Sequence, residues 1–246
     1  TRTRLTERLA RFFSYDWPNA VRSLWRETLV SACFMLLGAL VAYALTLHSV
    51  EWFYAFIPQD VAQERGPDAS AHDLHEILFK SHGSGGLTVF STFLFTHNAQ
   101  IAIFAFALGF ACCLPTAFLM IYNGLMLGAF FALHQRQGLA VDFGGWALIH
   151  GVTELFAVTL AGAAGFRIGW ALAFPGNASR IEALASAGRK AAIVMGGVVV
   201  MLAIAGLLEG FGRQLITSTP WRYGIAGATA VIWAAYFYGR PAIRSA

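Results

Sequence analysis

His150 and Glu154 place an imidazole and a carboxylate one helical turn apart inside a predominantly apolar stretch. They bound the segment His150-Gly151-Val152-Thr153-Glu154, within the run from about 143 to 174. A run of this length predicts a membrane-spanning helix, in which an ionisable side chain near the centre costs about 2.5–3.5 kcal/mol on insertion scales. Intramembrane Glu and His commonly mark the path of a proton, an ion or a small polar substrate. We therefore expect both side chains to face partners on other helices.

Three more polar side chains lie in apolar stretches, each beside small residues. Asn123 directly precedes a Gly-x-x-x-Gly pair, Glu209 lies inside another, and Asn98 shares a predicted helical face with alanine and glycine. Small residues four apart let a neighbouring backbone approach closely, and polar groups on that face form hydrogen bonds there instead of meeting lipid. The predicted polar cluster comprises Asn98, Asn123, His150, Glu154 and Glu209, and the predicted packing residues are Gly109, Gly124, Gly128, Ala157, Ala161 and Gly165.

This polar cluster has two interpretations. In the first, interhelical hydrogen bonds of about 0.5–2 kcal/mol each and an i, i+4 pair between Glu209 and Arg213 hold a helix bundle together. In the second, the same side chains form a site for a proton, an ion or a small polar substrate. The structural interpretation is the simpler one. A water-filled cavity that reaches the cluster would favour the functional one, and dry mutual hydrogen bonding the structural one.

The composition predicts an all-α polytopic membrane protein. Hydrophobic residues make up 57% of the 246 residues and charged residues 12%, with a mean hydropathy of +0.60. These values exclude an ordinary soluble domain. The net charge of +4 does not indicate a nucleic-acid surface, because the basic residues gather beside predicted spans rather than on a soluble face. The expected partner is therefore the lipid bilayer and not a nucleic acid.

Stretches with few charges predict a bundle of about six spans, within a range of five to seven. Arginines precede the first span and the acidic loop 48–98 follows it, so we expect both termini in the cytoplasm and this loop outside a prokaryotic cytoplasmic membrane. Arg136, Arg213 and Arg222 are exceptions to this charge bias, and Pro115 is expected in a first turn or at a kink. The predicted spans are 28–47, two within 87–133, 146–167, 191–210 and 223–238, with 87–96 as an alternative half-helix.

The chain is expected to divide into a basic cytoplasmic segment, 1–26, and a single transmembrane domain, 27–246. Leu5, Leu9 and Phe12 share a helical face flanked by arginines, which is typical of an N-terminal amphipathic helix at the inner membrane interface. A solvated cytoplasmic helix packed on the protein's own core fits the pattern equally well. We do not expect this segment to be a cleaved signal peptide.

Enzyme chemistry has little support. An intramembrane metallohydrolase needs about three ligands and a base, and the polar cluster with His97 supplies candidates, but His150-x-x-x-Glu154 lacks the second histidine of the helical zinc signature. We expect Cys33, Cys112 and Cys113 inside spans as small apolar packing residues. We predict no enzyme activity, no metal and no cofactor. Further side chains of metal-binding type, at spacings that match no closed zinc site, are Asp68, His72, Asp73, His75, Glu76 and His82.

The polar and small residues also carry a family resemblance. From about Phe90 to its end, the chain resembles the stage II sporulation protein M family. The most specific piece is His150-Gly151-x-x-Glu154 followed by the run Ala161-Gly162-Ala163-Ala164-Gly165. Before 90 the chain matches only as a basic segment, one span and an external loop. The other matching positions are Asn98, Gly109, Asn123, Gly124, Gly128, Glu209 and Gly210.

The resemblance implies an integral protein of the cytoplasmic membrane that anchors an envelope-remodelling assembly and does not itself degrade peptidoglycan. Many relatives occur in organisms that form no spores, so it does not establish sporulation. We expect an anchor or core subunit of a cell-envelope assembly, with envelope-remodelling protein partners. The small-residue stripes favour a homo-oligomer, but packing within a single bundle would account for them equally well. The alternative is a channel or transporter for an ion, a proton or a small polar solute, with its site built from the polar cluster in the outer half of the membrane.

Overall fold

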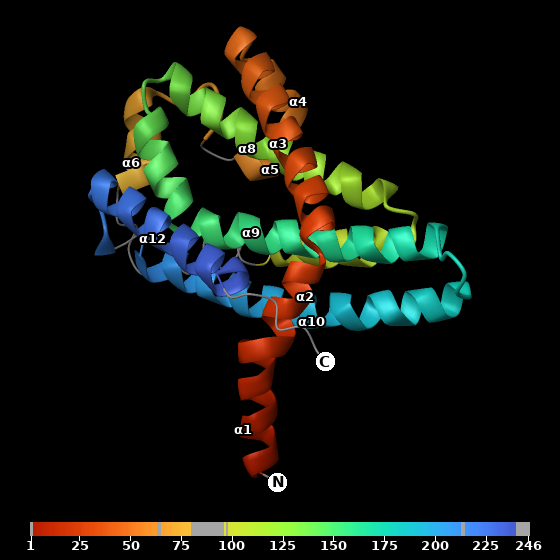
Figure 1. The fold of residues 1–246 in the computed structure, drawn as a ribbon. Helices are drawn as coiled ribbons and strands as arrows, with labels where there is room; N and C mark the ends of the chain where they lie inside the picture. The colour runs from red at the N-terminus through yellow and green to blue at the C-terminus, as the bar shows by residue number, and fades with distance from the viewer. Residues whose placement is uncertain (1, 63–64, 80–95, 97, 213–214, 240–246) are drawn as a thin grey trace.

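The protein is a bundle of helices. The computed structural model describes residues 2–62, 65–79, 96, 98–212 and 215–239, and these ranges contain helices and connections but no strand (Figure 1). The all-α prediction is confirmed. The helices before the first gap are α1 (Arg2–Arg11), η1 (Phe12–Asp16), α2 (Trp17–Ser23), α3 (Trp25–His48), α4 (Trp52–Phe56) and α5 (Gln59–Ala62). Those that follow are α6 (Ala71–Phe79), the helix Asn98–Phe110 with η2 (Leu108–Phe110) at its end, α8 (Leu114–Arg136), α9 (Ala140–Ala173), α10 (Arg180–Leu207), η3 (Leu208–Gly212) and α12 (Thr219–Tyr238).

Four of the described helices, α3, α8, α9 and α10, are long and apolar enough to cross a membrane. The helix Asn98–Phe110 is apolar but shorter, and α12 has 20 residues. The predicted count of six spans is therefore not confirmed and stays a prediction. The alternative half-helix 87–96 lies almost wholly outside the described residues. At about 1.5 Å per residue, the 34 residues of α9 extend well beyond a hydrocarbon core of about 30 Å.

Helices α3 and α8 cross with their backbones in direct contact. A methyl group on Gly124 would overlap the carbonyl group of Met35, and one on Gly128 would overlap that of Ala39. The contact is reciprocal, because a methyl group on Gly38 would overlap the carbonyl group of Ile121. Without side chains at these positions the two helices gain dispersion contacts that lipid cannot replace.

The long helix α9 lies at the centre of the fold, beside α10 and α12 (Figure 1). Its C-terminal half packs on the helix Asn98–Phe110, where Gly165 meets Gly109 and the carbonyl group of Ala105. Ala157 and Ala161 are fully buried in the main apolar core. The predicted packing residues thus contact other helices of the same chain, so they lend no support to the expected homo-oligomer, which stays a prediction.

The connection between the helix Asn98–Phe110 and α8 has an unusual backbone. Cys112 and Cys113 adopt φ angles of 55° and 72°, a left-handed conformation that non-glycine residues rarely take. Pro115 follows in the first turn of α8. This is one of the two positions expected for it, the other being a kink. The expectation that the cysteines lie inside helical spans is correct for Cys33 and wrong for this pair, because the chain turns there between two helices.

Two of the arginines that break the charge bias have backbone partners. Arg136 Nη1 donates to the carbonyl oxygen of Leu47 at 2.8 Å, in the last turn of α3. Arg222 Nη2 donates to the carbonyl oxygen of Leu78 at 3.1 Å, in the last turn of α6. The last carbonyls of a helix have no partner within it and carry its negative partial charge. Both arginines therefore act as caps for helix ends in the region that we predict to be external.

The N-terminal helix α1 projects away from the rest of the bundle (Figure 1). Its apolar residues Leu5 and Leu9 are 60% and 50% exposed. Leu5 and Leu9 thus do not pack on the protein's own core, whereas Phe12, the third residue of the predicted face, lies in η1 and packs against that core. Contact with a membrane surface stays a proposal.

Candidate intramembrane site

A cavity of about 320 Å³ lies between α8 and α9. Its outer end is bounded by Val61 of α5, by Arg65 and by Ile77 and Leu78 of α6. Its inner end lies at the first residue of the helix Asn98–Phe110. The described lining residues are Val61, Arg65, Ile77, Leu78, Asn98, Asn123, Met126, Leu127, Phe130, Phe131, His134, Phe143, Gly144, Trp146, Ala147, Leu148, His150, Gly151, Glu154, Leu155 and Val158.

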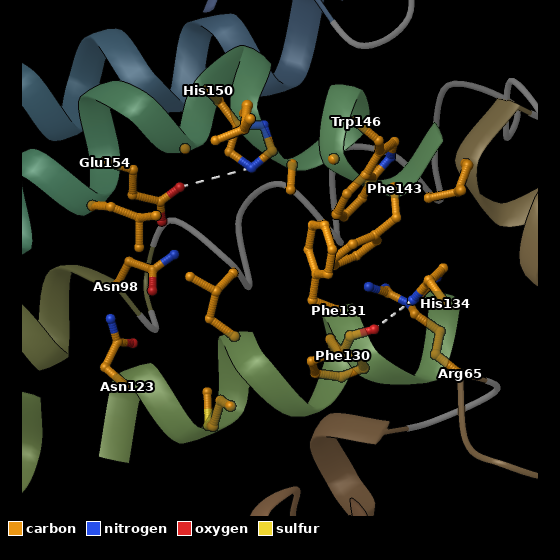
Figure 2. Close-up of a pocket in the computed structure, with 18 of the residues that line it drawn as sticks. Arg65, Asn98, Asn123, Phe130, Phe131, His134, Phe143, Trp146, His150 and Glu154 are labelled. Carbon is orange, nitrogen blue, oxygen red and sulfur yellow. Dashed lines mark hydrogen bonds and ion pairs between the residues drawn. The ribbon is translucent and has the colours of Figure 1, made fainter. Parts of the chain in front are cut away.

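Four members of the predicted polar cluster line the inner end of this cavity. Asn98, Asn123, His150 and Glu154 come from three helices, and the Asn98 amide lies between the Glu154 carboxylate and the Asn123 amide (Figure 2). His150 Nε2 and Glu154 Oε2 are 3.8 Å apart, which is an ion-pair distance when the imidazole is protonated but too long for a hydrogen bond. Tertiary packing thus brings together side chains that are up to 56 positions apart in the chain (98 to 154).

The carboxylate of Glu154 is buried and accepts no hydrogen bond from the described residues. The residue is 9% exposed, and no donor among the residues that the structure describes lies within hydrogen-bond distance of its oxygens. Within the same part of the chain, the Asn98 side chain has no hydrogen bond, and Asn123 makes one, from Nδ2 to Met35 Sδ at 3.4 Å. Buried polar groups are normally satisfied, so mutual hydrogen bonding among the described residues does not explain the buried Glu154 and Asn123.

Glu209 is the member of the cluster that does not line the cavity. It lies in η3, is 2% exposed, and is close enough to Glu154 for the two carboxylates to interact electrostatically. Two carboxylates in a membrane interior repel one another unless a proton or another cation accompanies them. The predicted pair with Arg213 involves a residue outside the described ranges.

An aromatic wall, formed by Phe131, His134, Phe143 and Trp146, runs along the cavity toward His150 (Figure 2). His134 stacks on Phe143 with ring centroids 4.0 Å apart, and Phe143 stacks on Trp146 at 5.8 Å. Trp146 in turn meets His150 edge to face at 5.8 Å. Sequence reasoning did not assign this wall to the site. The sequence does contain a signal for part of it. The spacing 143, 146, 150 and 154 places Phe143 and Trp146 on the same face of α9 as His150 and Glu154.

The outer end of the cavity depends on α6, whose first turn is closed by Ser70 and Asp73. Ser70 Oγ accepts from the Asp73 amide at 3.1 Å, and Asp73 Oδ2 accepts from the Ser70 amide at 3.2 Å and from Ser70 Oγ at 2.6 Å. This is a reciprocal capping arrangement. The hydrogen bonds from Ser70 favour the ionised carboxylate and so lower the pKa of Asp73 below its ordinary value.

Replacing Ser70 by alanine is expected to raise the pKa of Asp73 toward its ordinary value and to loosen α6. Because the folded-state pKa is lowered, the capping interaction is present above the ordinary carboxyl pKa and is lost as the pH falls through the folded-state value. Amide hydrogen exchange of residues 71–79 should be about fivefold faster in Ser70→Ala at pH 7. After correction for intrinsic rates, the difference should be smaller at pH 2 than at pH 7, and what remains comes from the hydrogen bond of the Asp73 amide to Ser70 Oγ, which does not depend on ionisation. An equal difference at both values would contradict a role for the ionised carboxylate.

No metal-binding arrangement of side chains is present among the described residues. Among the described residues, no group of three or more His, Cys, Asp and Glu side chains is arranged to hold a metal ion. His72 and Asp73 in α6 are exposed, with ring nitrogen and carboxylate 3.9 Å apart. His82 and His97, named above as potential ligands, lie outside the described residues.

Long apolar helices around a buried polar site define a helical membrane protein. The family model described as stage II sporulation protein M matches residues 28–212, which is most of the chain, and the protein belongs to this family. The matched range runs from α3 to η3 and contains all five members of the polar cluster. This family is not known as an enzyme family. No curated protein and no solved structure matches the chain.

Proposed function

We propose that this member of the family is a channel or transporter for a proton, an ion or a small polar solute, which it binds at the inner end of the cavity. The observation that carries this proposal is the cavity itself, which reaches Asn98, Asn123 and Glu154, and among the residues that the structure describes these three side chains make a single hydrogen bond, from Asn123 to Met35. A buried carboxylate costs several kcal/mol in lipid and is retained where it serves a pathway. A cavity of about 320 Å³ has room for water, and a water-filled cavity at these side chains favours transport over a purely structural cluster.

Flux through reconstituted liposomes tests the proposal. Proteoliposomes that hold a pH-sensitive dye and a panel of monovalent cations should show flux above that of empty liposomes. Glu154→Gln keeps the shape and the hydrogen-bonding capacity of the side chain but removes the charge, so we expect it to lower the flux at least tenfold with little change in thermal stability. The matched control is Glu51→Gln, an exposed acid outside the cavity, which should leave the flux unchanged. Equal flux in wild type and Glu154→Gln would count against this function.

The second candidate is an anchor or core subunit of a cell-envelope assembly, in which the protein recruits envelope-remodelling partners. The observation that favours it is the family match, because the family takes its description from a sporulation protein. Affinity purification from native membranes, with cross-linking before solubilisation, tests it. A stable stoichiometric partner from the envelope supports the anchor, and recovery of this chain alone, as a monomer or a homo-oligomer, counts against it.

The proposed orientation places both termini in the cytoplasm of a prokaryotic cell, the loop 48–98 outside and α1 on the inner surface of the cytoplasmic membrane. Its support is the charge pattern and the exposed amphipathic helix α1. A single cysteine introduced at Glu51 in a chain whose three cysteines are replaced by serine should react with an impermeant maleimide in intact cells. Reaction of a cysteine at Arg189 instead would reverse the orientation.

A further inference from the structure

We propose that the cavity binds a small amphiphilic amine, with a protonated ammonium group at Glu154, Asn98 and Asn123 and an apolar body along the aromatic wall. This inference deepens the proposed function, since it names the chemical class that the same site accepts. It rests on that proposal only in treating the cavity as a ligand site. Binding and transport are measured in separate experiments.

The charge at the inner end of the cavity selects the sign of the ligand. Among the described residues that line the cavity, Glu154 is the acid, and its buried carboxylate accepts no described hydrogen bond. His150 is the described basic group closest to it, at 3.8 Å, and Glu209 adds a second carboxylate nearby. Glu154 thus gives this end of the cavity an acid whose hydrogen-bonding positions are not taken by described donors. The inner end therefore favours a cationic ligand that donates hydrogen bonds.

The number and kind of polar groups at the inner end match a primary ammonium group. Glu154 is joined by the Asn98 and Asn123 amides, which point toward the same space from two other helices (Figure 2). The Nδ2 group of Asn123 already donates to Met35, which leaves its carbonyl oxygen as an acceptor. A carboxylate and two amide oxygens supply acceptors for the three N–H donors of a primary ammonium group. A quaternary ammonium lacks these donors and would leave the acceptors unsatisfied.

The rest of the cavity is largely apolar and suits the body of such a ligand. Phe131, Phe143 and Trp146 present ring surfaces between the inner end and His134, and aromatic faces attract both apolar bodies and cations. Asn123 and His134 are eleven positions apart on α8, or about 16 Å along the helix. Arg65 lines the cavity beside His134, so a second positive charge on the ligand is disfavoured there. The volume of about 320 Å³ suits a small molecule with one ring.

Equilibrium dialysis against the full-length protein in nanodiscs tests this inference. The probe is 2-phenylethylammonium, compared with neutral 2-phenylethanol and anionic phenylacetate, and empty nanodiscs correct for partition into lipid. We expect saturable binding of one amine per chain, at least tenfold tighter than that of the alcohol, and no saturable binding of phenylacetate. Equal affinity for amine and alcohol, or preference for phenylacetate, would overturn the inference without the need for any variant.

Three variants assign the binding to its groups. Glu154→Gln should weaken amine binding at least tenfold and abolish the preference for the amine over the alcohol, whereas the exposed Glu51→Gln should change neither. Trp146→Leu should weaken amine and alcohol binding alike, by about threefold to tenfold, because it removes ring surface but keeps the carboxylate. Unchanged amine affinity in Glu154→Gln would show that the amine binds elsewhere and would reject the site.

Binding and flux fail in distinguishable ways. Amine binding that depends on Glu154, without flux of any tested solute, would reject transport and keep the ligand class. Flux that depends on Glu154, with no saturable amine binding, would keep transport and reject the ligand class.

Discussion

Replacing Gly124 by alanine is expected to destabilise the bundle by about 3 kcal/mol, because overpacked sites cost about 1–3 kcal/mol and this one has no flexible neighbour. The added methyl group would overlap the backbone carbonyl group of Met35, and the backbone amide of Ala39 lies close to the same point. Neither group can rotate away, so α3 and α8 must separate along their whole crossing. Unfolding of the purified protein in mixed micelles, followed by circular dichroism against increasing dodecyl sulfate, measures the change.

The matched control is Gly188→Ala in α10. A methyl group there meets no atom within 4 Å, so the substitution adds helix propensity without strain. We expect unchanged or slightly higher stability, by up to about 1 kcal/mol. Equal effects of the two substitutions would mean that backbone contact between α3 and α8 does not hold the fold.

Replacing Arg222 by methionine is expected to cost about 3 kcal/mol, because each hydrogen bond from a charged donor contributes about 1.5–3 kcal/mol. Its side chain is fully buried, and Nε donates to the carbonyl oxygen of Ile216 at 2.9 Å while Nη2 donates to that of Leu78 at 3.1 Å. The guanidinium carbon also lies 4.8 Å from the ring centroid of Phe79. Methionine matches the volume of the stem but leaves two carbonyl oxygens without this donor. The same detergent titration measures the loss.

Two further variants separate the geometry of Arg222 from its charge. Arg222→Lys should recover less than half of the lost stability, because one ammonium cannot serve two carbonyl groups that the planar guanidinium bridges. Arg189→Met, at an exposed position of α10, should change stability by less than about 0.5 kcal/mol. Full recovery by lysine would show that the site requires the positive charge and not the two N–H donors of the planar guanidinium group.

These two sites share a physical cause. A membrane offers no hydrophobic force between helices, so helix association depends on close backbone packing and on satisfied polar groups. Gly124 supplies the first and Arg222 the second, which is why single substitutions at these positions have large expected effects. Glu154 differs from both, since its side chain is buried without described hydrogen bonds and so contributes little to holding the helices together.

Much of the architecture follows from local sequence. The apolar runs predicted the helices that became α3, α8, α9, α10 and α12, with ends that differ by a few residues at α3 and by up to eleven at α10. Such ends are set by caps, as at Ser179 and Glu182, whose reciprocal hydrogen bonds start α10 well before the apolar run begins. The turn at Cys112 and Cys113 was not predicted, because no glycine or asparagine signals its positive φ angles.

The sequence by itself determined that Asn98, Asn123, His150 and Glu154 lie in apolar helices on stripes of small residues, since residue type and a period of 3.6 are local properties. Only the tertiary structure decided that they line one cavity with an aromatic wall, while Glu209 lies beside it. The physical reason is that helix rotation and crossing are set by which backbones can touch, as at Gly109 and Gly165. Those contacts join segments far apart in the chain, and no local pattern specifies the space that they leave empty.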